Sequence, residues 1–295
     1  MSDLTPASAG YGGLDLHCSE YDTARVLIWP VPYEKTVSYG HGTAEGPAAI
    51  IAASSQMELY DEELGGETAE IGIHTLPEMS IDCDPPEMMT RLRSASRDLL
   101  QSGKFLCMLG GEHSISPPVV YSHAEKYSNL SVLQIDAHAD LRESYQDSPY
   151  SHACAMRRIL EVCPVVQVGI RSISTDEARA LPGLRSRMFY AKDIVGRKDW
   201  MQEAVDALTE NVYLTIDVDG LDPSLVPTTG TPEPGGLLWY ELLDFLRAVA
   251  KSRRIVGMDV VELSGGSESN APAFLTSKLI YKCLGYIFSE HVPRI

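Results

Sequence analysis

The sequence predicts an α/β fold in which helices cover both faces of a central, mostly parallel sheet of eight strands. Short apolar runs alternate with longer amphipathic stretches, several of these runs are apolar throughout, and no long linker interrupts them. A strand that is apolar throughout is covered on both faces, as in a parallel sheet flanked by helices. The predicted strands are Arg25–Pro30, Glu70–Leu76, Phe105–Leu109, Leu130–Ile135, Val165–Ile170, Met188–Ala191, Val212–Ile216 and Arg254–Asp259.

Helices are predicted between the strands, and three of them have recognisable ends. Asp84 followed by Pro85 is typical of an N-cap with proline in the first helical turn. Ser174 with Glu177 three residues later has the spacing of a capping box. The segment Pro272–Glu290 carries apolar residues at helical spacing and predicts a long C-terminal helix. The unbroken pattern predicts one catalytic domain over residues 25–295, after an N-terminal extension of residues 1–24.

The composition indicates a globular cytoplasmic protein. Hydrophobic residues make up 44% of the 295 positions and charged residues 22%, which is enough to bury a core. No apolar run approaches the ~18 residues of a membrane span, and the N-terminus lacks a signal-peptide pattern. The 6 cysteines form no C-x-x-C pair, which favours free thiols in a reducing compartment. The formal charge of −17 repels nucleic acid and anionic lipid, so neither is an expected partner, and it attracts a cationic substrate.

Three polar clusters each follow a predicted strand: G-G-E-H at 110–113, D-A-H-A-D at 136–140 and D-V-D-G at 217–220. In an open parallel sheet, ligands bind beyond the carboxyl ends of the strands. Residues two apart in an extended chain point to the same side. Asp136, His138 and Asp140 are therefore expected to converge, and so are Asp217 and Asp219. Taken singly, such a D-x-D or G-G-E-H run is more typical of a turn, and it is their shared placement that favours a site.

Metal ions explain how so many acids share one edge of the sheet. Four carboxylates in a shielded site repel each other, and two dications cancel their charge. Six side chains suit two metals that share bridging carboxylates: His113, Asp136, His138, Asp140, Asp217 and Asp219. Oxygen-rich ligation with two imidazoles and no thiolate favours Mn²⁺ over a structural zinc. Such a pair of ions lowers the pKa of a bridging water and supplies hydroxide at neutral pH.

These motifs resemble those of the ureohydrolase family, the arginases and agmatinases. The matching runs are G-G-E-H-S at 110–114, D-A-H-A-D at 136–140, T-I-D-V-D-G-L-D-P at 215–223, G-T-P-E-P-G-G at 230–236, T-A-E-G-P at 43–47 and G-M-D-V-V-E at 257–262. The resemblance extends from about residue 25 to the end of the chain. It implies an arginase-like, three-layer α/β/α fold, two Mn²⁺ ions per subunit, and assembly as a homotrimer or homohexamer.

The resemblance also implies roles for individual residues. His113, Asp136, Asp140 and Asp217 would bind one Mn²⁺, and Asp136, His138, Asp217 and Asp219 the other. The bridging hydroxide would attack the guanidinium carbon of a small cationic substrate, and Asp140 would relay its proton. Glu262 would pair with the guanidinium, for which a carboxylate is the natural partner. His152 would shuttle a proton to the leaving amine, and Thr231 would line the guanidinium pocket.

The surroundings of this core indicate agmatine rather than arginine as the substrate. Arginases carry an Asn shortly after D-A-H-x-D and G-N-x-H-G around the histidine. Here Leu141 and Arg142 follow the first motif, and Y-S-H-A-C occupies positions 150–154. The Ser–His pair and T-P-E-P-G-G resemble agmatinases, from which Ala153 and Cys154 depart. We therefore expect hydrolysis of agmatine to putrescine and urea.

Three alternatives stay open at this point. If Arg142 points into the pocket, it favours a carboxylate tail such as that of 4-guanidinobutyrate; we expect it to face solvent, as long cationic side chains usually do. A catalytically silent metal-binding scaffold is disfavoured because every matched residue is present. A binuclear phosphatase is disfavoured because no basic cluster accompanies the acids, and Glu262 would repel an anion.

Overall fold

Eight strands form the central sheet, and every neighbouring pair in it is parallel. The computed structural model describes residues 10–266 and 269–294. The strands are β1 (Val26–Val31), β4 (Ile73–Thr75), β5 (Phe105–Gly110), β6 (Leu130–Ile135), β7 (Val165–Ile170), β8 (Ser186–Tyr190), β9 (Asn211–Asp217) and β10 (Arg254–Val261). They lie in the order β4–β1–β5–β10–β9–β6–β7–β8. The predicted α/β fold is confirmed, and this sheet is parallel throughout.

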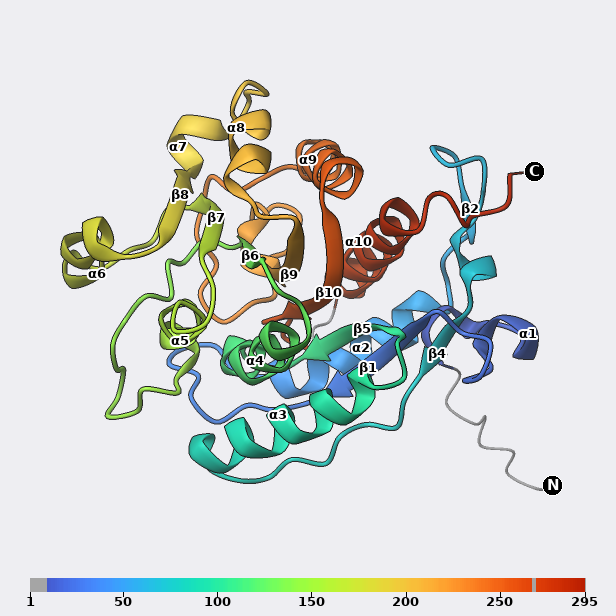
Figure 1. Cartoon of the computed structure of the whole chain (residues 1–295), viewed down its shortest axis with the longest axis horizontal. Helices are drawn as coiled ribbons and strands as arrows, with labels where there is room; N and C mark the ends of the chain where they lie inside the picture. The colour runs from blue at the N-terminus through green and yellow to red at the C-terminus, as the bar shows by residue number, and fades with distance from the viewer. Residues whose placement is uncertain (1–9, 267–268, 295) are drawn as a thin grey trace.

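Helices cover both faces of the sheet and complete a three-layer arrangement (Figure 1). One face carries α3 (Pro85–Leu100), α4 (Ser116–Lys126) and α5 (Ala155–Ile159), and the other carries α2 (Gly46–Ser54), α8 (Trp200–Ala207), α9 (Trp239–Ser252) and α10 (Ala271–Ile287). Residues of β1 alternate between the two cores: Val26 and Ile28 pack with the second group of helices, and Leu27 and Trp29 with the first. Because both faces are buried, the strand is apolar at every position.

The predicted helix starts are confirmed. At the start of α3, the Asp84 carboxylate accepts a hydrogen bond from the backbone N–H of Glu87. At the start of α6 (Thr175–Ala180), Ser174 and Glu177 make both hydrogen bonds of a capping box. The C-terminal helix begins one residue earlier than predicted and ends at Ile287. Local capping hydrogen bonds fix the starts of α3 and α6, which is why the sequence predicts them.

The second predicted strand is shorter than expected. Residues Thr68–Ile71 form a 3-10 turn, and β4 begins only at Ile73. Gly72 separates the two with a φ of 79°, and a Cβ there would lie 2.8 Å from the Cα of Ala24. The chain therefore needs glycine at a left-handed turn against a neighbouring backbone. The apolar pattern of this segment continues through the turn and does not reveal it.

The segment before β1 packs onto the sheet edge. Tyr11 is buried; its hydroxyl donates to the carbonyl oxygen of Ser277 at 2.6 Å and its backbone N–H to Oγ1 of Thr75 at 2.8 Å. Residues 1–9 of the predicted extension lie outside the described residues, and the domain division at residue 24 stays a prediction. The other α-helices and strands of the described residues are α1 (Leu16–Ser19), α7 (Ala191–Ile194) and an antiparallel pair, β2 (Tyr60–Asp61) and β3 (Gly66–Glu67).

The cysteines are free thiols, as predicted. Five of the six are buried, and Cys83 is half-buried. Within residues 10–266 and 269–294, no helix is long and apolar enough to cross a membrane.

Candidate metal centre and active site

Four neighbouring strands carry the candidate site at their carboxyl ends. In the sheet, β5, β10, β9 and β6 lie side by side in this order. His113 follows β5, and Asp136, His138 and Asp140 follow β6. Asp217 is the last residue of β9 and Asp219 comes just after it, while Glu262 follows β10. Ligands bind at this edge of open parallel sheets, and here the parallel register gathers residues as far as 149 positions apart in sequence, from His113 to Glu262.

His113 is held with one ring nitrogen facing three carboxylates. Its Nδ1 lies 3.1 to 3.5 Å from oxygens of Asp136, Asp140 and Asp217, is buried and makes no hydrogen bond. Its Nε2 lies 2.9 Å from Oγ1 of Thr215, whose hydroxyl donates to Asp259 at 2.6 Å. Because the threonine proton goes to Asp259, the histidine Nε2–H must be the donor to threonine. The lone pair of Nδ1 is then free to bind a metal ion.

His138 faces a second set of carboxylates that shares one member with the first. Its Nδ1 lies 2.8 Å from Asp219 and 3.7 Å from Asp136. Two groups of ligand atoms result, one of His113, Asp136 and Asp217 and the other of Asp136, His138 and Asp219. Asp136 belongs to both groups, as a carboxylate that bridges two ions does. The donor set and the bare Nδ1 of His113 fit a binuclear metal centre.

Burial and mutual repulsion shift the pKa values of these acids. Burial, with the charges of Asp219 and Asp140, raises the pKa of Asp136 to about 7. Burial and the neighbouring Asp219 and Asp136 also raise the pKa of Asp217 well above its ordinary value. Burial lowers the pKa of His138, but the hydrogen-bonded Asp219 outweighs it and raises that pKa to about 11. Divalent cations remove this repulsion and bind imidazole in its neutral form, so they favour the ionised acids and neutral histidines.

Two of the site residues have a left-handed backbone conformation, which residues other than glycine rarely adopt. Asp140 has a φ of 52° and Glu262 a φ of 66°. The Glu262 carboxylate accepts a hydrogen bond of 2.6 Å from the backbone N–H of His113, which fixes it beside the metal ligands. Burial and the charge of Glu112 raise the pKa of Glu262 well above its ordinary value. Strained backbones of this kind concentrate at functional sites, and a cationic group would hold Glu262 ionised.

A cavity of about 270 Å³ opens onto these residues. His138, Asp140, Asp217, Asp219 and Glu262 line it on the side of the sheet, and His152 and Thr231 line it from the loops. Oγ1 of Thr231 lies 3.4 Å from Nε2 of His138. His113 and Asp136 are buried and join the cavity through the carboxylates that they contact. The structure thus brings every predicted site residue to one place.

Comparison with known proteins identifies the family. The family described as the arginase family matches residues 24–285. The chain belongs to the arginase family.

An N(1)-aminopropylagmatine ureohydrolase of Synechocystis sp. is 39% identical over 277 residues, covering 91% of this chain and 90% of that protein. An agmatinase of Bacillus anthracis is 34% identical over 257 residues, covering 83% and 85%. The crystal structure of the agmatine ureohydrolase of Thermoplasma volcanium superposes with a TM-score of 0.84 at 27% identity, covering 94% and 95%. The protein is therefore a ureohydrolase, a hydrolase of linear amidines.

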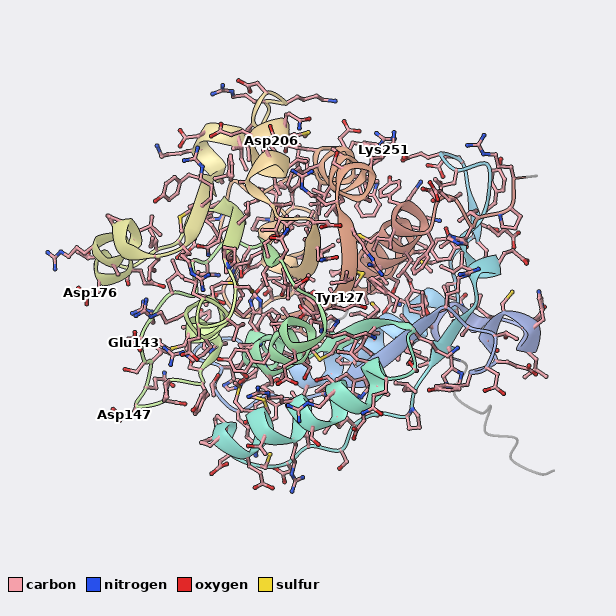
Figure 2. The ribbon with its side chains drawn as sticks, in the orientation of Figure 1. Tyr127, Glu143, Asp147, Asp176, Asp206 and Lys251 are labelled. Carbon is pink, nitrogen blue, oxygen red and sulfur yellow. The ribbon has the colours of Figure 1, made fainter. Side chains whose placement is uncertain are left out.

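The loops of this ureohydrolase place Arg142 differently from the solvent-facing position expected of it. Arg142 is half-buried and lines the cavity, and its guanidinium lies 5.0 Å from the centre of the Tyr145 ring. A cation over an aromatic face is stabilised there, which explains why the side chain does not extend into water. Beyond Arg142, the loop from β6 to α5 runs to the outer edge of the molecule, where Glu143 and Asp147 lie (Figure 2).

Sequence reasoning missed the residues that support the histidines of this ureohydrolase. Thr215 lies inside the T-I-D-V-D motif and Glu112 inside G-G-E-H, so both stood in recognised runs without an assigned role. Asp259 likewise lies inside the matched run G-M-D-V-V-E without an assigned role, whereas Thr36 carried no signal, because a single threonine in a loop is ordinary. Only the folded chain places them beside His113 and the cavity.

Proposed function

We propose that this ureohydrolase hydrolyses the terminal guanidinium group of N(1)-aminopropylagmatine to urea and spermidine, with agmatine, the substrate that the sequence predicts, as the second candidate. The observation that carries the proposal is the acid-lined cavity of about 270 Å³. The relative that is 39% identical is named an N(1)-aminopropylagmatine ureohydrolase, and the relative that is 34% identical is named an agmatinase. Both substrates are cations without a carboxylate. They suit a cavity in which the acids Glu177, Glu233 and Glu262 outnumber Arg142, whose charge alone would favour a carboxylate tail.

We assign two Mn²⁺ ions to the site. His113, Asp136, Asp140 and Asp217 would hold one ion, and Asp136, His138, Asp217 and Asp219 the other. The oxygen-rich donor set and the bare Nδ1 of His113 support this assignment. When bound, the ions supply a nucleophile at neutral pH by lowering the pKa of a water molecule.

The chain's own residues orient the substrate and move protons. The buried Glu262 carboxylate pairs with the guanidinium and holds its carbon over the metal ligands, and Thr231 bounds the same pocket. Asp140 accepts a proton from the attacking water. His152 delivers a proton to the leaving amine nitrogen, and the C–N bond breaks to give a neutral amine. The hydroxyl on the former guanidinium carbon gives up its proton, which restores that of His152, and becomes the carbonyl of urea. We further propose a homotrimer or homohexamer in the cytoplasm.

A substrate panel on the Mn²⁺-loaded protein tests the proposal. Urea release is measured with N(1)-aminopropylagmatine, agmatine, 4-guanidinobutyrate and arginine. We expect kcat/KM to be highest with N(1)-aminopropylagmatine and lower with agmatine. With 4-guanidinobutyrate and arginine it should be at least ~100-fold lower, because an acid-lined cavity repels their carboxylates. A higher kcat/KM with 4-guanidinobutyrate overturns the substrate assignment and gives Arg142 the specificity role. Absence of urea with every compound favours the silent scaffold.

A further inference from the structure

A chain of hydrogen bonds ties His152 to a buried carboxylate for which the proposed mechanism has no use. Glu112 is fully buried and accepts hydrogen bonds from four donors. The backbone N–H groups of Lys35 and Thr36 donate to Oε2 at 2.7 and 2.6 Å. The hydroxyls of Thr36 and Ser114 donate to Oε1 at 2.7 and 2.5 Å. Four donors around one carboxyl group fit an ionised carboxylate, which can only accept.

Thr36 then contacts His152 twice. Its Oγ1 lies 3.0 Å from the backbone nitrogen of His152 and 3.2 Å from the ring nitrogen Nδ1. A hydroxyl has one proton, and that of Thr36 is donated to Glu112. Toward His152 the oxygen can therefore only accept, so the ring nitrogen that faces it must carry the proton.

The neighbouring serine does not change this conclusion. The hydroxyl of Ser151 lies 3.3 Å from the same Nδ1 and can act as donor or acceptor. If it donated to a bare Nδ1, the lone pairs of that nitrogen and of the Thr36 oxygen would face each other at 3.2 Å, which is repulsive. With Nδ1 protonated, both hydroxyl oxygens accept and no such clash arises.

We propose that Thr36, held by Glu112, is a positioning residue that fixes His152 as the Nδ1–H tautomer. Nε2, on the side of the ring away from Thr36, is then the nitrogen that exchanges the proton with the leaving amine. His152 lines the cavity, and Tyr145 contacts its ring edge to face, with 5.8 Å between ring centres. The inference rests on the proposed role of His152 as proton donor and adds the residues that select its reactive nitrogen.

Kinetics of two positioning variants test it in the Mn²⁺-loaded enzyme. Thr36→Val keeps the shape and removes the hydroxyl; we expect kcat to fall about tenfold and KM to change less than about twofold, as for loss of one hydrogen bond that acts in the transition state. Thr36→Ser restores the hydroxyl and should stay within about threefold of the wild type. Mn²⁺ content should match the wild type in both variants.

Glu112→Gln reverses the donor–acceptor direction of the hydrogen bonds from residue 112 through Thr36 to His152. It also provides a test if Thr36→Val does not fold. The amide oxygen would accept from the two backbone N–H groups, so the amide NH₂ would face the hydroxyl of Thr36. Thr36 would then donate to Nδ1 and favour the opposite tautomer of His152. We expect kcat to fall at least as far as in Thr36→Val, about tenfold or more, again with little change in KM.

A double-mutant cycle separates this inference from the proposed function. His152→Ala should lower kcat about 100-fold, and in that background Thr36→Val and Glu112→Gln should each change kcat less than about twofold. If His152→Ala lowers kcat but both positioning variants match the wild type, or if their effects persist in the His152→Ala background, the role of Thr36 is overturned and that of His152 stands. If His152→Ala itself leaves kcat unchanged, the role of His152 is wrong and that of Thr36 fails with it.

Discussion

The two walls of the cavity are built from different parts of the fold. The metal wall consists of His138, Asp140, Asp217 and Asp219, which line the cavity, and of His113 and Asp136 behind them. These residues lie at or just after the carboxyl ends of β5, β6 and β9; five of them are buried and His138 is half-buried. The substrate wall consists of Arg142, Tyr145, His152, Thr231 and Glu233, which lie on the connections from β6 to α5 and from β9 to α9, and none of them is buried. Under the proposed function, the parallel sheet would carry the metal chemistry, and the loops would determine which substrate is accepted.

Both walls nevertheless hold a histidine by the same arrangement. On the strands, Asp259 accepts from Thr215, which in turn accepts from His113. On the loops, a threonine links Glu112 to His152 in the same sense. In both arrangements a buried carboxylate accepts the hydrogen bond of the threonine hydroxyl, which leaves the threonine oxygen to accept from the imidazole. The same arrangement can therefore orient an imidazole whether strands or loops supply the partners.

The largest effect is expected from removing the residue that both metal groups share. Asp136→Ala should lower the Mn²⁺ content below two ions per subunit and reduce turnover at least about a thousandfold, because one carboxylate serves both ions. Metal content is measured by elemental analysis of the dialysed protein. Asp206→Ala, at an exposed position of α8, is the matched control and should change neither quantity. Full metal content in Asp136→Ala contradicts the metal wall as defined.

The second effect tests the strand-borne support of that wall. Thr215→Val removes the hydroxyl between Asp259 and His113 and should weaken Mn²⁺ affinity about 10- to 100-fold, since the imidazole loses the contact that fixes its tautomer. Calorimetric titration of metal-stripped protein measures the affinity. Thr215→Ser keeps the hydroxyl and serves as the control. An unchanged affinity in Thr215→Val would mean that packing alone orients His113.

The metal wall could be anticipated from the sequence because its geometry is local. A strand end fixes the direction of the chain, so residues that follow it closely, Asp136 and His138, are expected at the same edge. Asp140 joins them through its left-handed backbone rather than through the two-residue period of an extended chain. The parallel sheet follows from runs that are apolar at every position. These patterns depend on residues close in sequence, and the edge at which ligands bind is common to open parallel sheets.

The supports of the histidines could not be anticipated, because they depend on distant contacts. Thr36 and His152 are 116 residues apart, and no local pattern marks either as the partner of the other. Arg142 was assigned to solvent from its charge, whereas the Tyr145 ring that holds it depends on the loop conformation. The turn at Gly72 was missed for a similar reason, since glycine is required there by the close approach of the Ala24 backbone.

Acid is expected to weaken the core beneath the metal wall. His123 on α4 is fully buried; its Nε2 makes no hydrogen bond and its ring lies 4.7 Å from that of Tyr213, which donates to Asp259. Burial lowers the pKa of His123 to about 4. In the unfolded chain the pKa is about 6.5, so between pH 6.5 and 4 the unfolded state binds a proton that the folded state does not. The free energy of unfolding should therefore fall with pH, by about 3 kcal/mol over this window.

Denaturant unfolding at pH 7 and pH 5 measures this loss. His123→Leu removes the titrating group and should reduce the difference between the two pH values by about 2 kcal/mol, the share of the window that lies above pH 5. An equal pH dependence in the variant and the wild type would assign the acid sensitivity to other groups.

The smallest effect is expected on the substrate wall. Glu233 is half-buried at the cavity, and Glu233→Gln removes a charge that attracts the amine end of a long substrate. We expect KM for N(1)-aminopropylagmatine to rise about two- to fivefold, in line with a partly screened ion pair, and KM for the shorter agmatine to rise less. Asp147→Asn is the matched control: it removes the same charge from an exposed position of the β6–α5 loop whose φ of 62° asparagine also tolerates. Because Glu233 belongs to neither group of candidate metal ligands, kcat and Mn²⁺ content should not change. A loss of either would mean that the two walls are coupled and that substrate choice cannot vary independently of the metal centre.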